Sequence, residues 1–133
     1  MSNQSPEALL AIVDGARESE IDRESAIHQL KDFPTDAVIA RLILALEDSD
    51  SGVRWAAAST LIEFGDPVAR PLLHTLVEKN DSVWLREGAY RVFHDTRSAK
   101  IQAATADVVK ALKGPAAGLM TTEAAVKALG KLG

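Results

Sequence analysis

The chain has 133 residues, of which 47% are hydrophobic and 26% charged, a formal net charge of −4 and no cysteine. The missing cysteines exclude disulfides, thiolate nucleophiles and cysteine-ligated metal centres. The acidic balance argues against a general nucleic-acid or anionic-membrane binder, which would need a basic patch. No apolar run approaches the ~18 residues of a membrane span, and the polar start of the chain is unlike a signal peptide. We therefore expect a cytoplasmic protein.

Eight helices are predicted, because apolar residues recur with the spacing of a helix face in eight segments. In chain order these segments are 6–18, 22–32, 36–48, 52–64, 67–79, 83–94, 99–113 and 122–132. Two kinds alternate along the chain. The first, third, fifth and seventh segments carry a leucine-rich stripe and are called leucine helices. The others are called arginine helices, because an arginine precedes the apolar stripe in the first three of them.

The joints between these segments carry residues that end one helix and begin the next. The Ser5-Pro6 dipeptide supplies an N-cap and a helix-starting proline. The Gly65-Asp66-Pro67 triplet supplies a left-handed residue, a cap and a first-turn proline. Pro71 falls beyond the first turn of its helix and is expected to distort it. We expect residues 116–120 to form a loop and residues 1–5 a disordered tail.

The arginine helices form an internal repeat. Arg23, Arg54 and Arg86 lie 31 and 32 residues apart, and each is followed by apolar residues at +3, +4 and +7. Because a single helix pair cannot cover its own apolar stripe, successive pairs stack and share one elongated core. The repeat therefore predicts an all-α, right-handed superhelix of about eight helices, as a single domain over residues 1–133.

The clearest copy of the repeat is LEDSDSGVRWAAASTL at 46–61, followed by FGDP at 64–67. It resembles a HEAT repeat, and it is most similar to the short variety that also occurs in phycobilisome lyases. The similarity spans nearly the whole chain and is strongest over residues 36–79. The resemblance implies hydrogen bonds between neighbouring repeats from an aspartate, Asp48 or Asp50, and from Arg54.

The repeated arginines are expected to form a ladder along the stack. Arg23, Arg54 and Arg86 lie beside apolar positions and would be partly buried, so each needs an acidic or carbonyl partner. Counting from the preceding leucine helix puts Trp84 where the third arginine is expected, so Arg86 fits only with two extra loop residues. Thr122 takes the arginine position in the fourth repeat.

The sequence offers little that could catalyse a reaction. The three histidines, His28, His74 and His94, are far apart in sequence. The paired His-Glu dipeptides of HEAT-like iron-dependent hydroxylases do not occur. No glycine-rich phosphate loop, serine-centred elbow or His-Glu-x-x-His motif is found. We therefore expect no catalytic residue, no metal and no cofactor.

We expect binding at the solvent face of the leucine helices, because in stacked helix pairs the second helices usually line the concave side. With about 100° of rotation per residue, outward rows on that face contain six charged or apolar candidates: Arg41, Leu44, His74, Glu78, Asp107 and Lys110. Two interpretations are open. The face is either solvated or a protein-docking groove centred on Arg41, Leu44, His74 and Lys110.

Two tryptophans and the last helix are further candidates. Trp55 lies beside the buried stripe of its helix, so it either anchors a partner or packs against the next repeat. Trp84 is expected to fill the space that the extra residues of the third repeat open. The last segment has an apolar stripe that no further leucine helix would cover: Ala125, Val126, Leu129 and Leu132. This stripe is either capped by neighbouring lysines or docks on a second copy of the chain.

These observations favour a non-catalytic scaffold or adaptor whose preformed concave surface binds another protein. The main alternative rests on resemblance alone: a subunit or chaperone of a phycobilin-lyase-like system that attaches chromophores. Nucleic-acid binding of the kind known for HEAT-like glycosylases would need a basic concave groove. Three acidic residues interrupt such a groove here: Asp48, Glu78 and Asp107.

Overall fold

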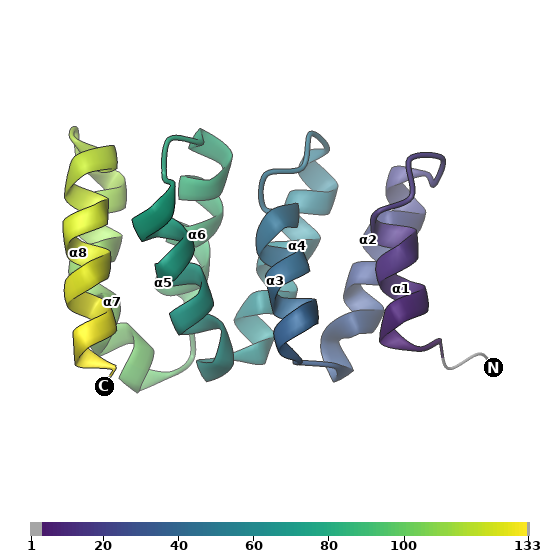
Figure 1. Ribbon diagram of the computed structural model, residues 1–133, viewed down its shortest axis with the longest axis horizontal. Coiled ribbons are helices and arrows are strands. Elements are labelled where there is room, and N and C mark those ends of the chain that lie inside the picture. Colours follow the sequence, from purple (N-terminus) through teal and green to yellow (C-terminus); the bar gives the residue numbers. More distant parts are fainter. Residues whose placement is uncertain (1–3, 133) are drawn as a thin grey trace.

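The computed structural model describes residues 4–132, and over this range the chain folds into eight α-helices stacked side by side in two layers (Figure 1). The helices are α1 (Pro6–Val13), α2 (Glu20–Gln29), α3 (Asp36–Ala45), α4 (Ser51–Phe64), α5 (Ala69–Glu78), α6 (Val83–Asp95), α7 (Ala99–Lys113) and α8 (Ala117–Lys131). Short 3-10 turns occupy Leu30–Asp32 and Asp66–Val68. The prediction of an all-α solenoid is confirmed.

Six helices begin at a side-chain cap. In each, a hydroxyl or carboxylate oxygen accepts a hydrogen bond from the backbone N–H three residues further on; the capping residues are Ser5, Ser19, Thr35, Asp50, Ser82 and Ser98. Such a cap contributes ~1 kcal/mol. Ser5 lies inside the predicted tail but is ordered as the cap of α1, and residues 1–3 lie outside the described residues.

Several helix boundaries differ from the prediction. Helix α1 ends at Val13, five residues early, and the Val13 carbonyl accepts a hydrogen bond from Arg23. Residues 117–120 belong to α8 and are not a loop. Pro71 does not distort α5, since that helix begins at Ala69 and the third residue has no intrahelical partner for an N–H.

The layers follow the predicted alternation as far as α6 and then reverse. Helices α1, α3 and α5 form one layer, and α2, α4 and α6 form the other (Figure 1). In the last pair, α7 packs against α6 and α8 packs against α5. The assignment of 99–113 to the leucine layer and of 122–132 to the arginine layer is therefore wrong. The buried face of α8 consists of small side chains, Thr121, Ala124, Ala125 and Ala128, which let it lie close to both α5 and α7.

A continuous hydrophobic core runs between the two layers. Its largest fully buried side chains come from every helix pair up to α6 and include Leu9, Ile27, Leu42, Leu61, Leu73 and Phe93. Burial of each such side chain stabilises the fold by about 1.5–3 kcal/mol. The stripe of α8 is partly covered as well: Ala125 is buried and Leu129 and Leu132 pack on the core, while Val126 is exposed. The outer side of the stripe is therefore open at Val126, whereas its other three residues pack on the core.

Candidate functional site

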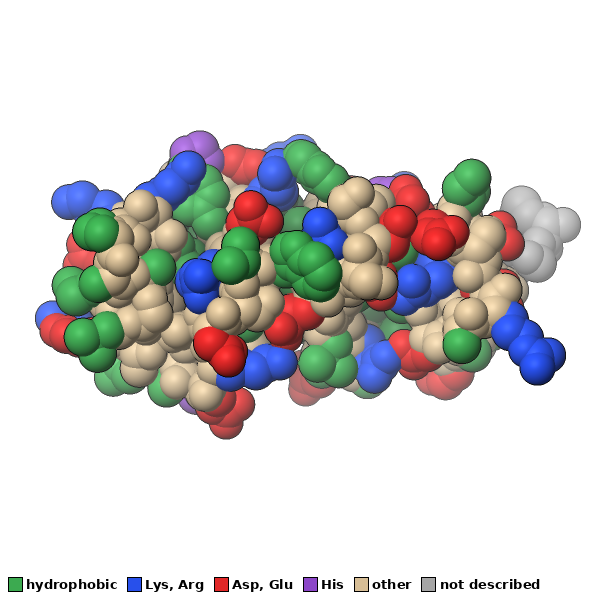
Figure 2. Space-filling model, turned by 90° about the horizontal axis from the view of Figure 1, so that it is seen from above, with side chains coloured by type: hydrophobic (Ala, Val, Ile, Leu, Met, Phe, Trp, Pro, Cys, Tyr) green, Lys and Arg blue, Asp and Glu red, His purple; other side chains and the backbone are tan. Residues whose placement is uncertain are grey.

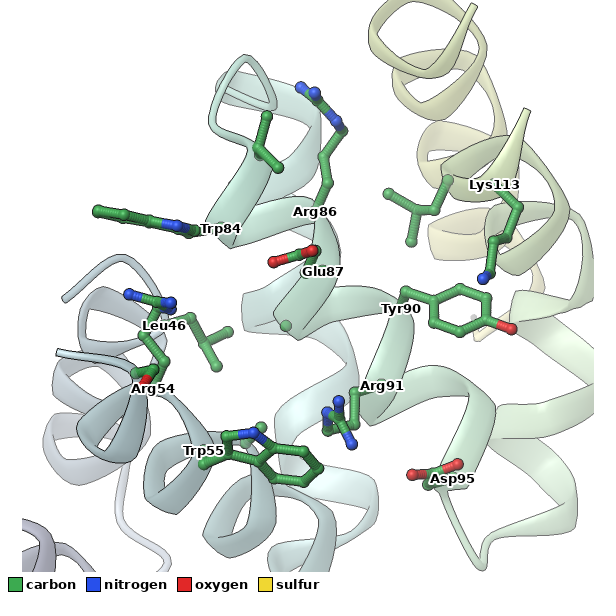
Figure 3. Close-up of a pocket in the computed structure, with 15 residues that line it drawn as sticks. Leu46, Arg54, Trp55, Trp84, Arg86, Glu87, Tyr90, Arg91, Asp95 and Lys113 are labelled. Carbon is green, nitrogen blue, oxygen red and sulfur yellow. The ribbon is translucent and has the colours of Figure 1, made fainter. Parts of the chain in front are cut away.

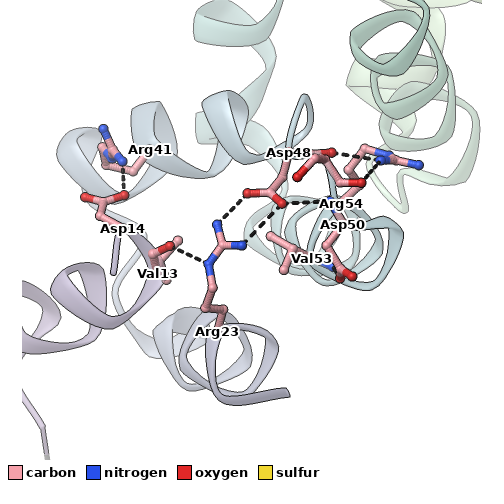
Figure 4. Close-up of polar contacts among 9 residues, drawn as sticks. Val13, Asp14, Arg23, Arg41, Asp48, Asp50, Val53 and Arg54 are labelled. Carbon is pink, nitrogen blue, oxygen red and sulfur yellow. Dashed lines mark hydrogen bonds and ion pairs between the residues drawn. The ribbon is translucent and has the colours of Figure 1, made fainter. Parts of the chain in front are cut away.

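The arginine ladder joins the first two repeats through Asp48 (Figure 4). Arg23 donates from Nε to the Val13 carbonyl at 2.8 Å and from both terminal nitrogens to the Asp48 carboxylate. The same carboxylate accepts from the Asp50 N–H at 2.9 Å, and the Asp48 carbonyl accepts from Nη1 of Arg54 at 2.7 Å. Asp48 therefore links two successive arginines, one through its side chain and the other through its backbone.

The ion pair between Arg23 and Asp48, which forms one rung of the ladder, is kept ionised by its surroundings. Burial alone would raise the pKa of the Asp48 carboxyl group. The hydrogen bonds from Arg23 and from the Asp50 backbone, together with the charges of Arg23 and Arg54, outweigh burial and lower that pKa. The hydrogen bond to Asp48 raises the pKa of Arg23 against the effect of burial. The rung is a structural contact, with only 20% of the Arg23 and 15% of the Asp48 side chain exposed.

We call the contact between α2 and α4 the first joint of the ladder and the contact between α4 and α6 the second joint. The second joint lacks a carboxylate like that of Asp48. Arg86 donates from Nη1 to the Asn80 carbonyl six residues earlier at 2.5 Å, just as Arg54 does to the Asp48 carbonyl. The match confirms the two extra residues before Arg86, and it places Asn80 where the first joint has Asp48. The Asn80 amide is bound elsewhere, since its nitrogen donates to Thr122 Oγ1 on α8 at 2.8 Å.

A cavity of about 760 Å³ opens between α4 and α6 (Figure 3). Trp84 of α6 reaches across to Arg54 of α4, whose guanidinium carbon lies 4.3 Å from the ring centroid. In the opposite direction, Trp55 of α4 lies under Arg91 of α6, at 3.4 Å. The two crossed contacts hold the walls of this opening, which we call the α4–α6 groove. Its floor includes Leu46.

The walls meet closely at the floor of the groove. A Cβ atom on Gly88 would lie 2.8 Å from Cδ2 of Leu46, so glycine permits this approach of α6 to the end of α3. The tryptophans at the mouth remain open to solvent, with Trp55 52% and Trp84 41% exposed. Trp84 extends to Arg54 and does not fill the space of the extra residues, so that prediction is wrong. Trp55 packs against Arg91 of the next repeat, as one of its two interpretations predicts, and half of its side chain remains exposed.

The α4–α6 groove is cationic although the chain is acidic overall. Its lining includes four cations and two carboxylates, namely Arg54, Arg86, Arg91, Lys113, Glu87 and Asp95. None of the four cations forms an ion pair with a described residue. They contact backbone carbonyls or aromatic rings, as Lys113 does at 4.5 Å from the Tyr90 ring. A cation–ring contact stabilises by only ~0.5–1 kcal/mol at an exposed site, so these N–H groups remain able to bind an anionic partner.

The predicted row on the leucine helices is divided between the two layers. The layer of α3 and α5 carries Arg41, Leu44, His74 and Glu78, whereas α7 in the other layer carries Asp107 and Lys110. The prediction that the outward rows continue from α3 and α5 to Asp107 and Lys110 is therefore wrong. Arg41 is ion-paired with Asp14 of the preceding repeat. Leu44 on α3 is 51% exposed, and His74 on α5 is exposed as well.

Repeat counting could have located the groove from the sequence. Alignment on the ladder arginines places Trp55 on Glu24 of the first repeat and Trp84 on Gly52 of the second. At the second joint, two tryptophans therefore replace the carboxylate of Glu24 and the adjacent Gly52 of the first joint. Arg91 carries no such signal, because its position relative to Trp55 depends on how α4 and α6 pack.

The remaining surface of residues 4–132 carries a second, smaller cavity of about 370 Å³, whose lining includes Arg70, Lys100 and Leu132. On the face seen in Figure 2, acidic and basic side chains are interspersed along the molecule, and hydrophobic side chains lie near its middle and at the end formed by the last two helices. Among residues 4–132, no cluster of three or more His, Cys, Asp or Glu side chains is arranged to hold a metal ion. No helix in the same range is long and apolar enough to cross a membrane.

Comparison with known proteins identifies the family. A family model described as HEAT repeats matches residues 6–94. The match runs from the start of α1 almost to the end of α6, so it stops before the pair of helices whose layers are reversed. Searches of curated proteins and of solved structures found no match. Since the matched segment covers about two thirds of the chain and has the stacked helix pairs and arginine ladder described above, the protein belongs to the HEAT-repeat family.

Proposed function

We propose that this protein is a non-catalytic scaffold or adaptor and that it binds its partner protein in the α4–α6 groove. HEAT repeats generally mediate protein–protein interaction, and their stacked helices present extended binding surfaces. The observation that carries the proposal is the pair of half-exposed tryptophans, Trp55 and Trp84, beside cations that have no carboxylate partner. Tryptophan and arginine are the residues most enriched among those that dominate binding energy at interfaces.

The groove is ordered before any partner arrives. Each tryptophan is held against an arginine of the opposite helix, Trp84 against Arg54 and Trp55 against Arg91. Ordering a flexible side chain on binding costs about 0.5–1.5 kcal/mol, and these contacts reduce that cost. The exposed leucine and histidine on α3 and α5 offer a weaker surface, because the neighbouring cation, Arg41, is already paired with Asp14.

Chemical cross-linking followed by affinity capture from the native host tests this proposal. The groove variant carries Trp55→Ser and Trp84→Ser, and a matched variant of the other layer carries Leu44→Asp and His74→Glu. We expect a partner that is captured by the original protein and the second variant but lost by the groove variant. Loss in the second variant alone would move the site to α3 and α5. Failure of all three proteins to capture a partner would contradict the scaffold role.

A chromophore-related role is the second candidate, and one observation favours it. The groove places aromatic rings beside guanidinium groups, which suits a planar ligand with carboxylate arms. A subunit or chaperone of a phycobilin-lyase-like system would bind such a ligand. Mixing the protein with a linear tetrapyrrole and recording the visible spectrum tests this role. A spectral change that Trp55→Ser and Trp84→Ser abolish would support it, and an unchanged spectrum would exclude it.

A further inference from the structure

The two joints of the ladder differ at three equivalent positions, and all three differences open the second joint. At the first joint Asp48 supplies a carboxylate to Arg23. At the second joint the equivalent residue is Asn80, whose amide is bound to Thr122 and to the Leu76 carbonyl. Arg54 is therefore left without the carboxylate that its counterpart has.

The space beside the arginine changes in the same direction. At the first joint Glu24 lies against Gly52, where an added Cβ would come within 2.3 Å of the Glu24 carboxylate. The equivalent residues at the second joint are Trp55 and Trp84. These side chains diverge to opposite walls of the α4–α6 groove (Figure 3). A closed, internally neutralised contact is thus replaced by an open one with exposed aromatic rings.

Arg54 retains hydrogen-bonding capacity in this setting. Its Nη1 donates to the carbonyls of Asp48 and Ser49, at 2.7 and 3.3 Å. Its Nε and Nη2 have no hydrogen-bond partner among residues 4–132. Guanidinium groups bind carboxylates through paired N–H donors, and such charge-assisted bonds are roughly twice as strong as neutral ones.

We propose that an acidic segment of the partner protein docks in the α4–α6 groove and that one of its carboxylates accepts from Nε and Nη2 of Arg54, in place of the carboxylate that Asp48 supplies to Nη1 and Nη2 of Arg23. The inference rests on the scaffold function and deepens it by naming the chemistry of the partner. An apolar side chain of the same segment contacts Trp55 and Trp84. The partner thereby completes a ladder rung that this chain leaves incomplete.

Charge favours an acidic peptide over a nucleic acid as the occupant. Four cations line the groove, but Glu87 lies between the two crossed tryptophan contacts and Asp95 lies at the far end (Figure 3). A phosphate backbone carries a charge at every nucleotide and needs a continuous basic track. A peptide can place a carboxylate beside Arg54 and an uncharged residue beside Glu87. The net charge of −4 further opposes binding of a polyanion.

Intrinsic fluorescence provides the test, because the only two tryptophans of the chain both line the groove. The probe is a set of short peptides in which Asp and Glu alternate with Leu or Phe. The matched control peptides carry Asn and Gln at the acidic positions. We expect saturable fluorescence changes with the acidic peptides and binding at least about tenfold weaker with the amide peptides, the usual effect of losing one charge-assisted hydrogen bond.

Two variants locate the contact. Arg54→Gln should weaken binding of the acidic peptides by about tenfold and leave the amide peptides unaffected. Arg17→Gln makes the same change of charge at an exposed position outside the groove and should leave both affinities unchanged. Circular dichroism confirms that each variant is folded at the temperature used.

Three results would overturn the inference. They are equal binding of acidic and amide peptides, no fluorescence response to any acidic peptide at millimolar concentration, and a response to a single-stranded oligonucleotide alone. A partner that is captured through the groove but binds Arg54→Gln as well as the original protein would leave the scaffold function standing and refute only this inference. Absence of both capture and peptide binding would refute the two together.

Discussion

The rung between Arg23 and Asp48 should stabilise the fold far more than an exposed ion pair does. An exposed pair contributes about 0.2–1 kcal/mol, and loss of one partner of a fully buried pair costs about 3–5 kcal/mol. Here only 20% and 15% of the two side chains are exposed, and both terminal nitrogens of Arg23 donate to the carboxylate. We therefore expect a coupling energy of about 2 kcal/mol between the two side chains, the value of one hydrogen bond to a charged group.

A double-mutant cycle measures this coupling. Arg23→Met keeps the aliphatic stem, and Asp48→Asn keeps an acceptor for the Asp50 N–H. Each single variant and the double variant are unfolded in urea and followed by their helical circular dichroism. Each kcal/mol lost should lower the Tm by about 4 °C in a chain of this size.

The second joint supplies the matched control. Arg54→Met and Asn80→Ala remove the equivalent side chains, which share no hydrogen bond. Their coupling should lie within about 0.3–0.5 kcal/mol of zero, as for independent sites. A coupling below about 0.5 kcal/mol at the first joint, or equal couplings at the two joints, would refute the distinction on which the open groove depends.

Three further results are expected. Gly65 has φ +74°, whereas Gly130 lies in α8, and neither has an atom within 4 Å of an added Cβ. Gly65→Ala should therefore cost about 1–3 kcal/mol, while Gly130→Ala should stabilise by up to about 1 kcal/mol, both measured in urea; destabilisation by both would contradict this reasoning. Gly88→Ala should cost about 1–3 kcal/mol by overpacking against Leu46, so an unchanged urea midpoint would show that the two helices can separate freely. As pH falls below the ordinary carboxyl pKa of about 3.9, the unfolded chain binds a proton before the folded chain does, because folding lowers the pKa of Asp48; stability should fall there, and Asp48→Asn should flatten that part of the profile.

Most of the fold could be predicted because the repeat consists of helix caps and apolar residues, whose effects depend on residues nearby in the sequence. The caps Ser19, Asp50 and Ser82 precede Arg23, Arg54 and Arg86 by the same four residues, so each arginine helix begins in the same register. Eight of the nine apolar residues that follow are buried as their spacing predicts, whereas Tyr90 is only partly buried and lines the groove. The positive φ after α4 was also predictable, since Gly65 stands before Asp66 and Pro67. The predicted cap at Asp66 is wrong, because Asp66 begins a 3-10 turn and its side chain caps no helix.

The last helix pair could not be assigned to its layers from spacing alone. Helix α7 has the apolar spacing of a leucine helix, but spacing defines a face of the helix and not the neighbour against which that face packs. The neighbour is decided by contacts far apart in sequence. Arg70 of α5 donates to the Leu132 carbonyl at 2.9 Å, and the small buried residues of α8 fit beside α5. Because of this error, Asp107 and Lys110 were predicted on the same surface as the candidates of α3 and α5, whereas they lie in the other layer.

The groove could not be predicted from the repeat pattern, because that pattern consists of the positions at which the repeats agree. The groove forms at positions where they differ. The position six residues before the ladder arginine is Asp48 in one repeat and Asn80 in the next, and neither residue is unusual by itself. A solenoid whose joints are all internally neutralised gains stability but offers its arginines to no partner. A joint that gives up its carboxylate forgoes about 2 kcal/mol, the value expected for the first rung, and keeps a charged, ordered site in its place. That exchange is what a binding surface within a repeat array requires, and the coupling at the two joints of this chain measures it directly.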